Sequence, residues 1–111
     1  MSGATPQLAD TIAAIATAPG RSGLAVLRIS GPAAPRILFR LAPSLGGKAP
    51  PARRQVLLPL EHPETGETLD RALVCRFEAP HSYTGEDTVE VSCHGGDLTP
   101  RLILDAILAA G

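Results

Sequence analysis

The chain has 111 residues, 44% of them hydrophobic and 19% charged, a composition typical of one globular domain with a single core. Its formal net charge of −1 and its three aromatic residues provide neither a cationic excess nor a stacking surface, so we do not expect this chain alone to bind RNA directly. Residues 1–10 have no basic or apolar part of a signal peptide, and no apolar run approaches the roughly 20 residues of a membrane helix. We therefore expect a cytoplasmic protein.

Two strands and a helix are predicted in the first third of the chain. Residues 11–17 (TIAAIAT) form a nearly continuous apolar run, which predicts a central strand, and residues 24–30 (LAVLRIS) predict a second strand. The glycine-containing loop between them does not decide whether the two strands pair. Residues 32–42 (PAAPRILFRLA) predict a helix, because Pro32 suits the first helical position and an apolar stripe follows at Ile37, Leu38 and Leu41.

The middle of the chain alternates loops with strands. Residues 43–54 are rich in proline and glycine and are expected to be the least structured segment. Strands are predicted at 55–61 and 71–77, around a turn at 62–70. Pro59 indicates that the first of these strands lies at a sheet edge or is interrupted.

The last two predicted elements are the clearest strand, residues 88–94 (TVEVSCH), and a helix over residues 97–111. The order ββαβββα predicts one α+β domain over residues 1–111, with helices packed on a mixed or antiparallel five-stranded sheet. Because the last helix runs to the end of the chain, we expect a fragment of a longer protein cut at a domain boundary. The apolar side of that helix is predicted to contain Leu98, Leu102, Ile103, Ala106, Ile107 and Ala110.

Polar residues occupy one face of the strand 88–94. Alternation places Val89, Val91 and Cys93 on the core face and Thr88, Glu90, Ser92 and His94 on the other. Gly95 and Gly96 follow and allow a sharp turn toward the last helix, whose first N–H groups favour an anionic or carbonyl-bearing ligand. The alternative is that Glu90 is a solvated strand residue and His94 a turn residue.

Arg28 interrupts the apolar strand 24–30, and a partly buried guanidinium needs a partner. Glu90 is the obvious candidate, because it also lies in the middle of a strand between valines. Such a pair can be purely structural. It can also bind a ligand that offers a carboxylate to the arginine and paired N–H donors to the glutamate, as a folate does.

Several other features of the sequence give weaker evidence for a functional site. The loop at residues 18–23 (APGRSG) lacks the GxxxxGK[ST] pattern of a nucleotide site, and Arg21 at its tip is either a solvated residue or a ligand contact. Ser92 and His94 do not form a nucleophile pair, since the sequence places no acid to orient the histidine. Cys75 and Cys93 are expected to be reduced, buried thiols without a metal.

Residues 10–32 (DTIAAIATAPGRSGLAVLRISGP) and 82–96 (SYTGEDTVEVSCHGG), with the helix after them, resemble the N-terminal domain of the tRNA modification GTPase family known as MnmE or TrmE. The first motif of that family reads much like D-T-I-x-A-x-A-T-x-P-G-R-x-G-x-x-x-x-R-I-S-G. The second reads much like Y/F-T-G-E-D-x-x-E-x-x-x-H-G-G. Both occur here in the expected order.

The resemblance implies a cytoplasmic homodimer that hydrolyses GTP with potassium and magnesium at a G domain. With an FAD-dependent partner, GidA or MnmG, the family modifies the wobble uridine of certain tRNAs at carbon 5, adding an aminomethyl-type group. The resemblance also implies that the N-terminal domain has the fold of folate-dependent one-carbon enzymes, dimerises, and binds 5-formyltetrahydrofolate. Arg28 and Glu90 match the folate-site positions of the family, and Arg21, His94, Gly95 and Gly96 match motif positions near that site.

This sequence departs from the family pattern in places. Asp97 stands where proline often follows H-G-G, and Cys93 replaces a glycine or small residue. A Walker-type loop is absent, so we expect this chain to have no GTPase or other catalytic activity of its own. Two rivals remain: an interaction module with a structural Arg28–Glu90 pair and no ligand, and a free-standing one-carbon transferase, for which the chain is short.

Overall fold

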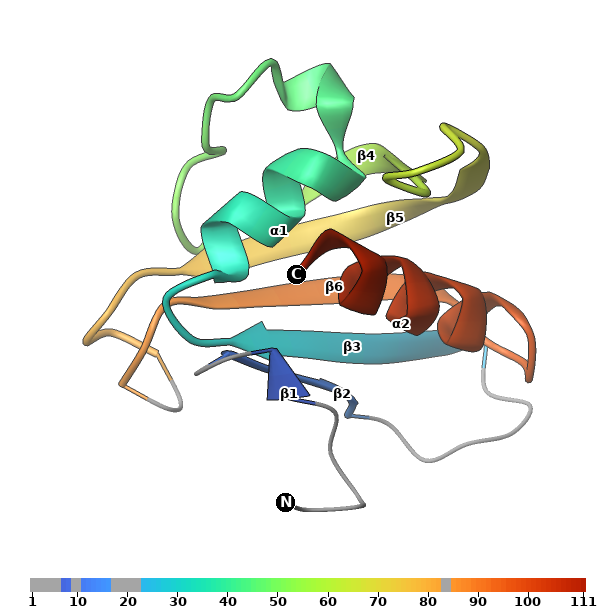
Figure 1. The fold of residues 1–111 in the computed structure, drawn as a ribbon. Coiled ribbons are helices and arrows are strands. Elements are labelled where there is room, and N and C mark those ends of the chain that lie inside the picture. The colour runs from blue at the N-terminus through green and yellow to red at the C-terminus, as the bar shows by residue number, and fades with distance from the viewer. Residues whose placement is uncertain (1–6, 9–10, 17–22, 83–84) are drawn as a thin grey trace.

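The structure is a computed structural model that describes residues 7–8, 11–16, 23–82 and 85–111. A six-stranded sheet of order β1-β2-β3-β6-β5-β4 carries both α-helices on one face (Figure 1), and every pairing between neighbouring strands is antiparallel. The predicted α+β fold is therefore confirmed, and the sheet is antiparallel rather than mixed. The strands are β1 (Gln7–Leu8), β2 (Thr11–Ile15), β3 (Leu24–Ser30), β4 (Val56–Glu61), β5 (Thr68–Phe77) and β6 (Thr88–His94), and the helices are α1 (Ala34–Leu41) and α2 (Thr99–Ala110).

The predicted order of five strands and two helices is found, with two short additions. The two-residue strand β1 pairs with β2 and makes the sheet six-stranded. A 3-10 helix, η1 (Pro43–Leu45), lies in the segment 43–54, which was expected to be the least structured. Strand β5 begins at Thr68, three residues before its predicted start, so the preceding turn is shorter than expected.

Strands β3 and β6 form the centre of the sheet. They pair over seven residues, from Leu24 opposite His94 to Ser30 opposite Thr88, and both have the bounds predicted from the sequence. Strand β2 pairs directly with β3 and lies between β1 and β3, next to the edge rather than at the centre. Strand β4 is an edge strand, as Pro59 indicated.

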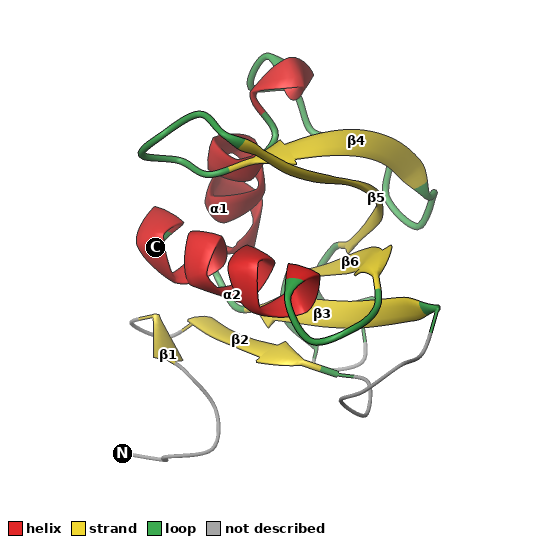
Figure 2. Cartoon of the chain, turned by 90° about the vertical axis from the view of Figure 1, so that its right-hand side faces the viewer, coloured by secondary structure: helices red, strands yellow, loops and turns green. Residues whose placement is uncertain are grey.

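The core fills the space between the sheet and the two helices, around which the sheet curls (Figure 2). One side chain in two along β3 and β6 points into this core, as strand alternation requires. The core-facing residues of these two strands are Ala25, Leu27, Ile29, Val89, Val91 and Cys93, each at most 4% exposed.

The apolar stripe of α2 differs from the predicted one. Its buried residues are Pro100, Ile103, Ala106, Ile107 and Ala110, whereas Leu98 is 67% exposed and Leu102 is 39% exposed. The helix begins two residues later than expected, and Leu98 precedes it. Leu102 lies a quarter-turn from the buried stripe, because successive helical residues are rotated by about 100°. In the described part of the chain, no helix is long and apolar enough to cross a membrane.

Candidate functional site

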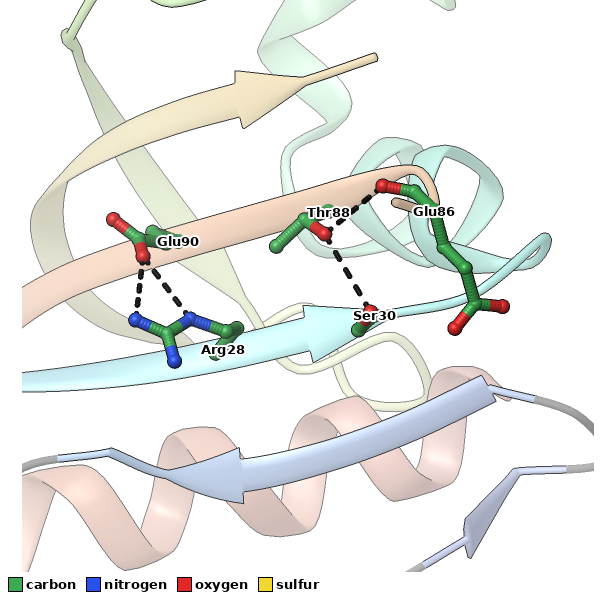
Figure 3. A network of polar contacts seen from close by, with 5 residues as sticks. All are labelled: Arg28, Ser30, Glu86, Thr88 and Glu90. Carbon is green, nitrogen blue, oxygen red and sulfur yellow. Dashed lines mark hydrogen bonds and ion pairs between the residues drawn. The ribbon is translucent and has the colours of Figure 1, made fainter. Parts of the chain in front are cut away.

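Arg28 and Glu90 are direct cross-strand partners on β3 and β6. The Nε and Nη2 atoms of Arg28 both donate to the same oxygen of Glu90, Oε2, at 3.0 and 2.8 Å (Figure 3). Within the described residues, the second oxygen, Oε1, accepts no hydrogen bond. The predicted pairing of these two residues is thus confirmed. It uses one carboxylate oxygen and leaves the other available to a ligand.

The side chains of this pair are 35% exposed for Arg28 and 21% exposed for Glu90. They lie on the sheet face turned away from the helices, which we call the open face. A dry core would bury both side chains, and a solvated surface pair would expose them more. The pair is therefore positioned so that a bound molecule can reach it.

The surroundings of the pair on the open face are mixed, with apolar side chains and hydroxyl groups. Alternation and register place the outward side chains of all five long strands on this face. In the row next to the pair, Val26 lies opposite Ser92, Ser92 opposite Leu73, and Leu73 opposite Leu57. The exposed large apolar residues of the open face are Ile12 (44%), Leu24 (57%), Leu57 (51%) and Leu73 (37%).

A hydroxyl pair lies beside the ion pair (Figure 3). Ser30 and Thr88 are cross-strand partners, and their hydroxyl oxygens lie 3.5 Å apart. Thr88 also donates to the backbone oxygen of Glu86 at 3.1 Å. Thr88 belongs to the polar face predicted for this strand, but it is only 1% exposed. Its hydrogen bonds satisfy the buried hydroxyl.

His94 ends β6 and is held by Asp70 of β5. The carboxylate of Asp70 accepts the backbone N–H of His94 at 2.9 Å and lies 2.8 and 3.0 Å from Nδ1. The sequence placed no acid to orient His94, and the structure corrects this by placing Asp70 there. No sequence signal pointed to Asp70, since it lies 24 residues away, in what the sequence predicted to be a turn.

The environment of Asp70 favours its ionised form. Burial alone would raise the pKa of this carboxyl group, but hydrogen bonds from His94 and from the backbone N–H of Arg71 lower the pKa below its usual value. An ionised carboxylate only accepts hydrogen bonds, so Nδ1 of His94 carries the hydrogen. Because the His94 side chain is 73% exposed, Nε2 is free to meet a ligand or solvent.

The two glycines after His94 form the turn that leads toward α2. Gly95 donates its N–H to the backbone oxygen of Gly23 at 3.1 Å, which ties the turn to the start of β3. Gly96 has φ of 96°, a conformation that side-chain-bearing residues rarely adopt. Arg21, the remaining candidate, lies outside the described residues.

Both cysteines are free, as expected. Burial raises the pKa of Cys93 to about 11, and the charge of Asp70 adds to this effect. Burial, with the charge of Glu90 beside it, also raises the pKa of Cys75. Such thiols are poor nucleophiles. No group of three or more side chains of the kinds that bind metals occurs among the residues that the structure describes.

Residues 11–111 match the family model described as "GTP-binding protein TrmE N-terminus". The chain belongs to the TrmE N-terminal family. This assignment agrees with the two motifs noted in the sequence, one of which contains Arg28 and the other Glu90 and His94.

Curated relatives in this family are similar over nearly the whole chain. A protein of Koribacter versatilis is 44% identical over 94% of this chain, one of Laribacter hongkongensis is 46% identical over 94%, and one of Bordetella petrii is 50% identical over 90%. Each is named tRNA modification GTPase MnmE. The chain spans only 23%, 22% and 21% of the lengths of these three relatives. The match therefore concerns one domain of much longer proteins.

Proposed function

We propose that this chain is a folate-binding and dimerising domain of a tRNA-modifying GTPase. The observation that carries the proposal is the partly exposed Arg28–Glu90 pair on the two central strands, on the sheet face turned away from both helices. A partly exposed ion pair contributes little to stability, so its place on the two central strands needs another reason. Recognition of a ligand with complementary polar groups provides that reason.

The residues present fit 5-formyltetrahydrofolate. The free oxygen of Glu90 suits paired N–H donors such as those of a pterin ring, while Arg28 fixes the orientation of the carboxylate. His94 lies on the same strand face four residues along, about 13 Å from Glu90. When bound, the folate supplies a one-carbon unit. The protein residues bind and orient it, and Arg21, Gly95 and Gly96 belong to the same proposed site.

The apolar part of the open face supports dimerisation. Among the residues that the structure describes, four of the six exposed large hydrophobic ones lie there, at Ile12, Leu24, Leu57 and Leu73. Leu57 and Leu73 are cross-strand partners, and exposed apolar residues that lie together on a sheet face usually mark a surface that another protein covers. We propose a second copy of this chain as that protein, with the folate site at or beside the interface.

At the level of the longer protein, we propose the activity for which the relatives are named. A G domain beyond this chain would hydrolyse GTP with potassium and magnesium. An FAD-dependent partner of the GidA or MnmG type would act with it in the cytoplasm on the wobble uridine of tRNA, at carbon 5. The support is the identity of 44–50% between this chain and proteins named tRNA modification GTPase.

The proposal is tested by titrating 5-formyltetrahydrofolate into the purified chain by calorimetry. Wild type is expected to bind at micromolar concentration or tighter, about −8 kcal/mol or better. Arg28→Ala and Glu90→Gln are expected to lose this binding while remaining folded. Glu64→Gln, which neutralises an exposed carboxylate in the turn between β4 and β5, is the matched control and should bind as wild type does.

One observation favours a second candidate, an interaction module without a ligand. Arg28 and Glu90 contact each other directly, as a structural ion pair would. This candidate predicts a folded, dimeric wild-type chain that gives no heat with the folate. It also predicts that Arg28→Ala and Glu90→Gln lower the stability of the domain and weaken self-association.

A further inference from the structure

The near-zero net charge of this protein conceals two halves of opposite sign. Between Asp10 and Glu61 the chain has seven basic residues and no acidic one. From Glu61 to the end it has ten acidic and three basic residues. The net charge of the whole chain does not show this segregation. It becomes visible only from the positions of the basic residues in the fold.

Five of the seven basic residues lie on α1 and in the segment 43–54 and are exposed to solvent. We call this group, Arg36, Arg40, Lys48, Arg53 and Arg54, the basic surface. One contact places the segment beside α1, and another ties it to β5. Ala49 lines the same small cavity as Pro35 and Phe39 of α1, and the backbone N–H of Arg53 donates to Arg76 of β5 at 2.7 Å. Figures 1 and 2 show α1 and this segment at the same end of the molecule.

The charges of the basic surface are not neutralised within the described part of the chain. None of its five side chains forms a salt bridge there, and the only side-chain hydrogen bond among them runs from Arg40 to the backbone oxygen of Ala110, at 2.9 Å. Two acidic residues, Glu78 and Asp87, line the cavity beside α1, and among the described residues only Glu78 has an ion-pair partner. Glu78 pairs with Arg76, and Asp87 accepts the backbone N–H of Ala79.

The acidic residues that follow β4 in the sequence lie at the end of this strand that is far from the basic surface. Arg54 precedes the start of β4, whereas Glu61 ends the strand and Glu64 and Glu67 follow in the turn. A strand of this length separates its ends by about 17 Å, well beyond the screening length of about 8 Å at physiological ionic strength. At that distance these acidic residues are largely screened, and the five cations of the basic surface outnumber Asp87, the one cavity carboxylate without an ion-pair partner in the described part of the chain.

We propose that the basic surface binds the phosphate backbone of RNA. Four of its five residues are arginines, whose planar guanidinium groups match phosphate oxygens. Aromatic side chains are scarce in this protein, which favours contacts to phosphates over stacking on bases. The choice of RNA over another polyanion rests on the proposed function, since the relatives are named for tRNA modification. This revises the expectation from net charge that the chain does not bind RNA directly.

The basic surface is independent of the folate site. Helix α1, which contains Arg36 and Arg40, covers one face of the sheet (Figure 1), whereas strand alternation places Arg28 and Glu90 on the opposite, open face. Two copies joined through their open faces would therefore leave both basic surfaces accessible. The basic surface can in this way contact a long polyanion without competing with the open face, where the second copy and the small ligand are proposed to bind.

The test compares two variants that each lose two exposed arginines. Arg36→Gln with Arg54→Gln changes the basic surface, and Arg71→Gln with Arg101→Gln removes the same charge elsewhere. Arg40 is kept because it contacts Ala110, and Arg53 is kept because its φ of 60° is unusual for a residue with a side chain. Binding of a fluorescent tRNA transcript is measured by anisotropy from 25 to about 200 mM salt, where phosphate contacts respond strongly to salt.

Wild type and the Arg71/Arg101 variant are expected to bind the transcript with similar affinity and salt slope. The Arg36/Arg54 variant is expected to bind about tenfold or more weakly at low salt, with a slope smaller by about 1.5. The proposal would be overturned if the two variants bound the transcript equally well, or if wild type did not bind it. Binding of wild type to phosphatidylserine vesicles but not to the transcript would also overturn it. The folate titration on the Arg36/Arg54 variant should be unchanged, so that failure of this inference and failure of the folate site are distinguishable.

Discussion

The carboxylate of Asp70 holds His94 at two points, the backbone N–H and the ring nitrogen Nδ1. The contact joins the first half of β5 to the end of β6, next to the glycine turn. It leaves the opposite ring nitrogen, Nε2, facing outward on an exposed imidazole. Asp70 is therefore a positioning residue for His94, and it also joins the ends of two strands.

Replacing Asp70 with asparagine is expected to lower the free energy of unfolding at pH 7 by about 1–2 kcal/mol, because hydrogen bonds to a charged group are lost. The folded-state pKa of Asp70 is lowered, so its stabilising contribution is complete above its ordinary pKa of 3.8. It is lost as the pH falls through the folded-state pKa. Urea unfolding at pH 7, 5 and 3 measures this, with Asp105→Asn as an exposed control. A difference from wild type that is the same at all three pH values would contradict the assignment.

The Arg28–Glu90 pair is expected to contribute little to stability. Both side chains are partly exposed, so the coupling energy from a double-mutant cycle should be at most about 1 kcal/mol. Urea unfolding of Arg28→Gln, Glu90→Gln and the double variant measures it. A small coupling energy together with complete loss of folate binding indicates a ligand site. A coupling energy of about 3 kcal/mol or more would favour the structural alternative.

Self-association is expected to depend on the apolar rows of the open face. Leu57 and Leu73 are cross-strand partners that are 51% and 37% exposed, and changing both to aspartate places two charges where a second copy would pack. The double variant is expected to be monomeric in analytical ultracentrifugation at concentrations where wild type is dimeric. Leu98→Asp, at a position 67% exposed beside α2, is the control and should leave the mass unchanged. A double variant that still dimerises would place the interface on another surface.

The buried stripe of α2 predicts unequal effects at two adjacent residues. Ile103 is fully buried, so Ile103→Ala is expected to cost about 2–4 kcal/mol of unfolding free energy. Leu102 is 39% exposed, and Leu102→Ala should cost less than about 1 kcal/mol. Thermal or urea unfolding of the two variants measures the difference. Equal losses would mean that both residues contribute to the core, as the sequence pattern suggested.

The local sequence pattern was enough to predict most of the strands and helices. The bounds of β3 and β6 follow from apolar alternation and from the glycines beside them, because both signals act within a few residues of chain. The pairing of Arg28 with Glu90 was also predictable, since two charged residues in the middle of apolar strands each need a partner. The family follows from the two motifs, which the match over residues 11–111 confirms.

Other features depend on where the chain folds back on itself. Asp70 reaches His94 only because β5 lies beside β6 and extends beyond the last residue of β6. The local sequence does not indicate how far one strand extends beyond the other. The sequence pattern placed Leu102 on the same face as Ile103, but the packing angle of α2 on the sheet decides which of the two is buried. The open face and the basic surface likewise exist only once both helices lie on the same side of the sheet. Sequence alone thus determined the strands, the ion pair and the family, whereas tertiary packing decided which surfaces remained uncovered and which distant residues met.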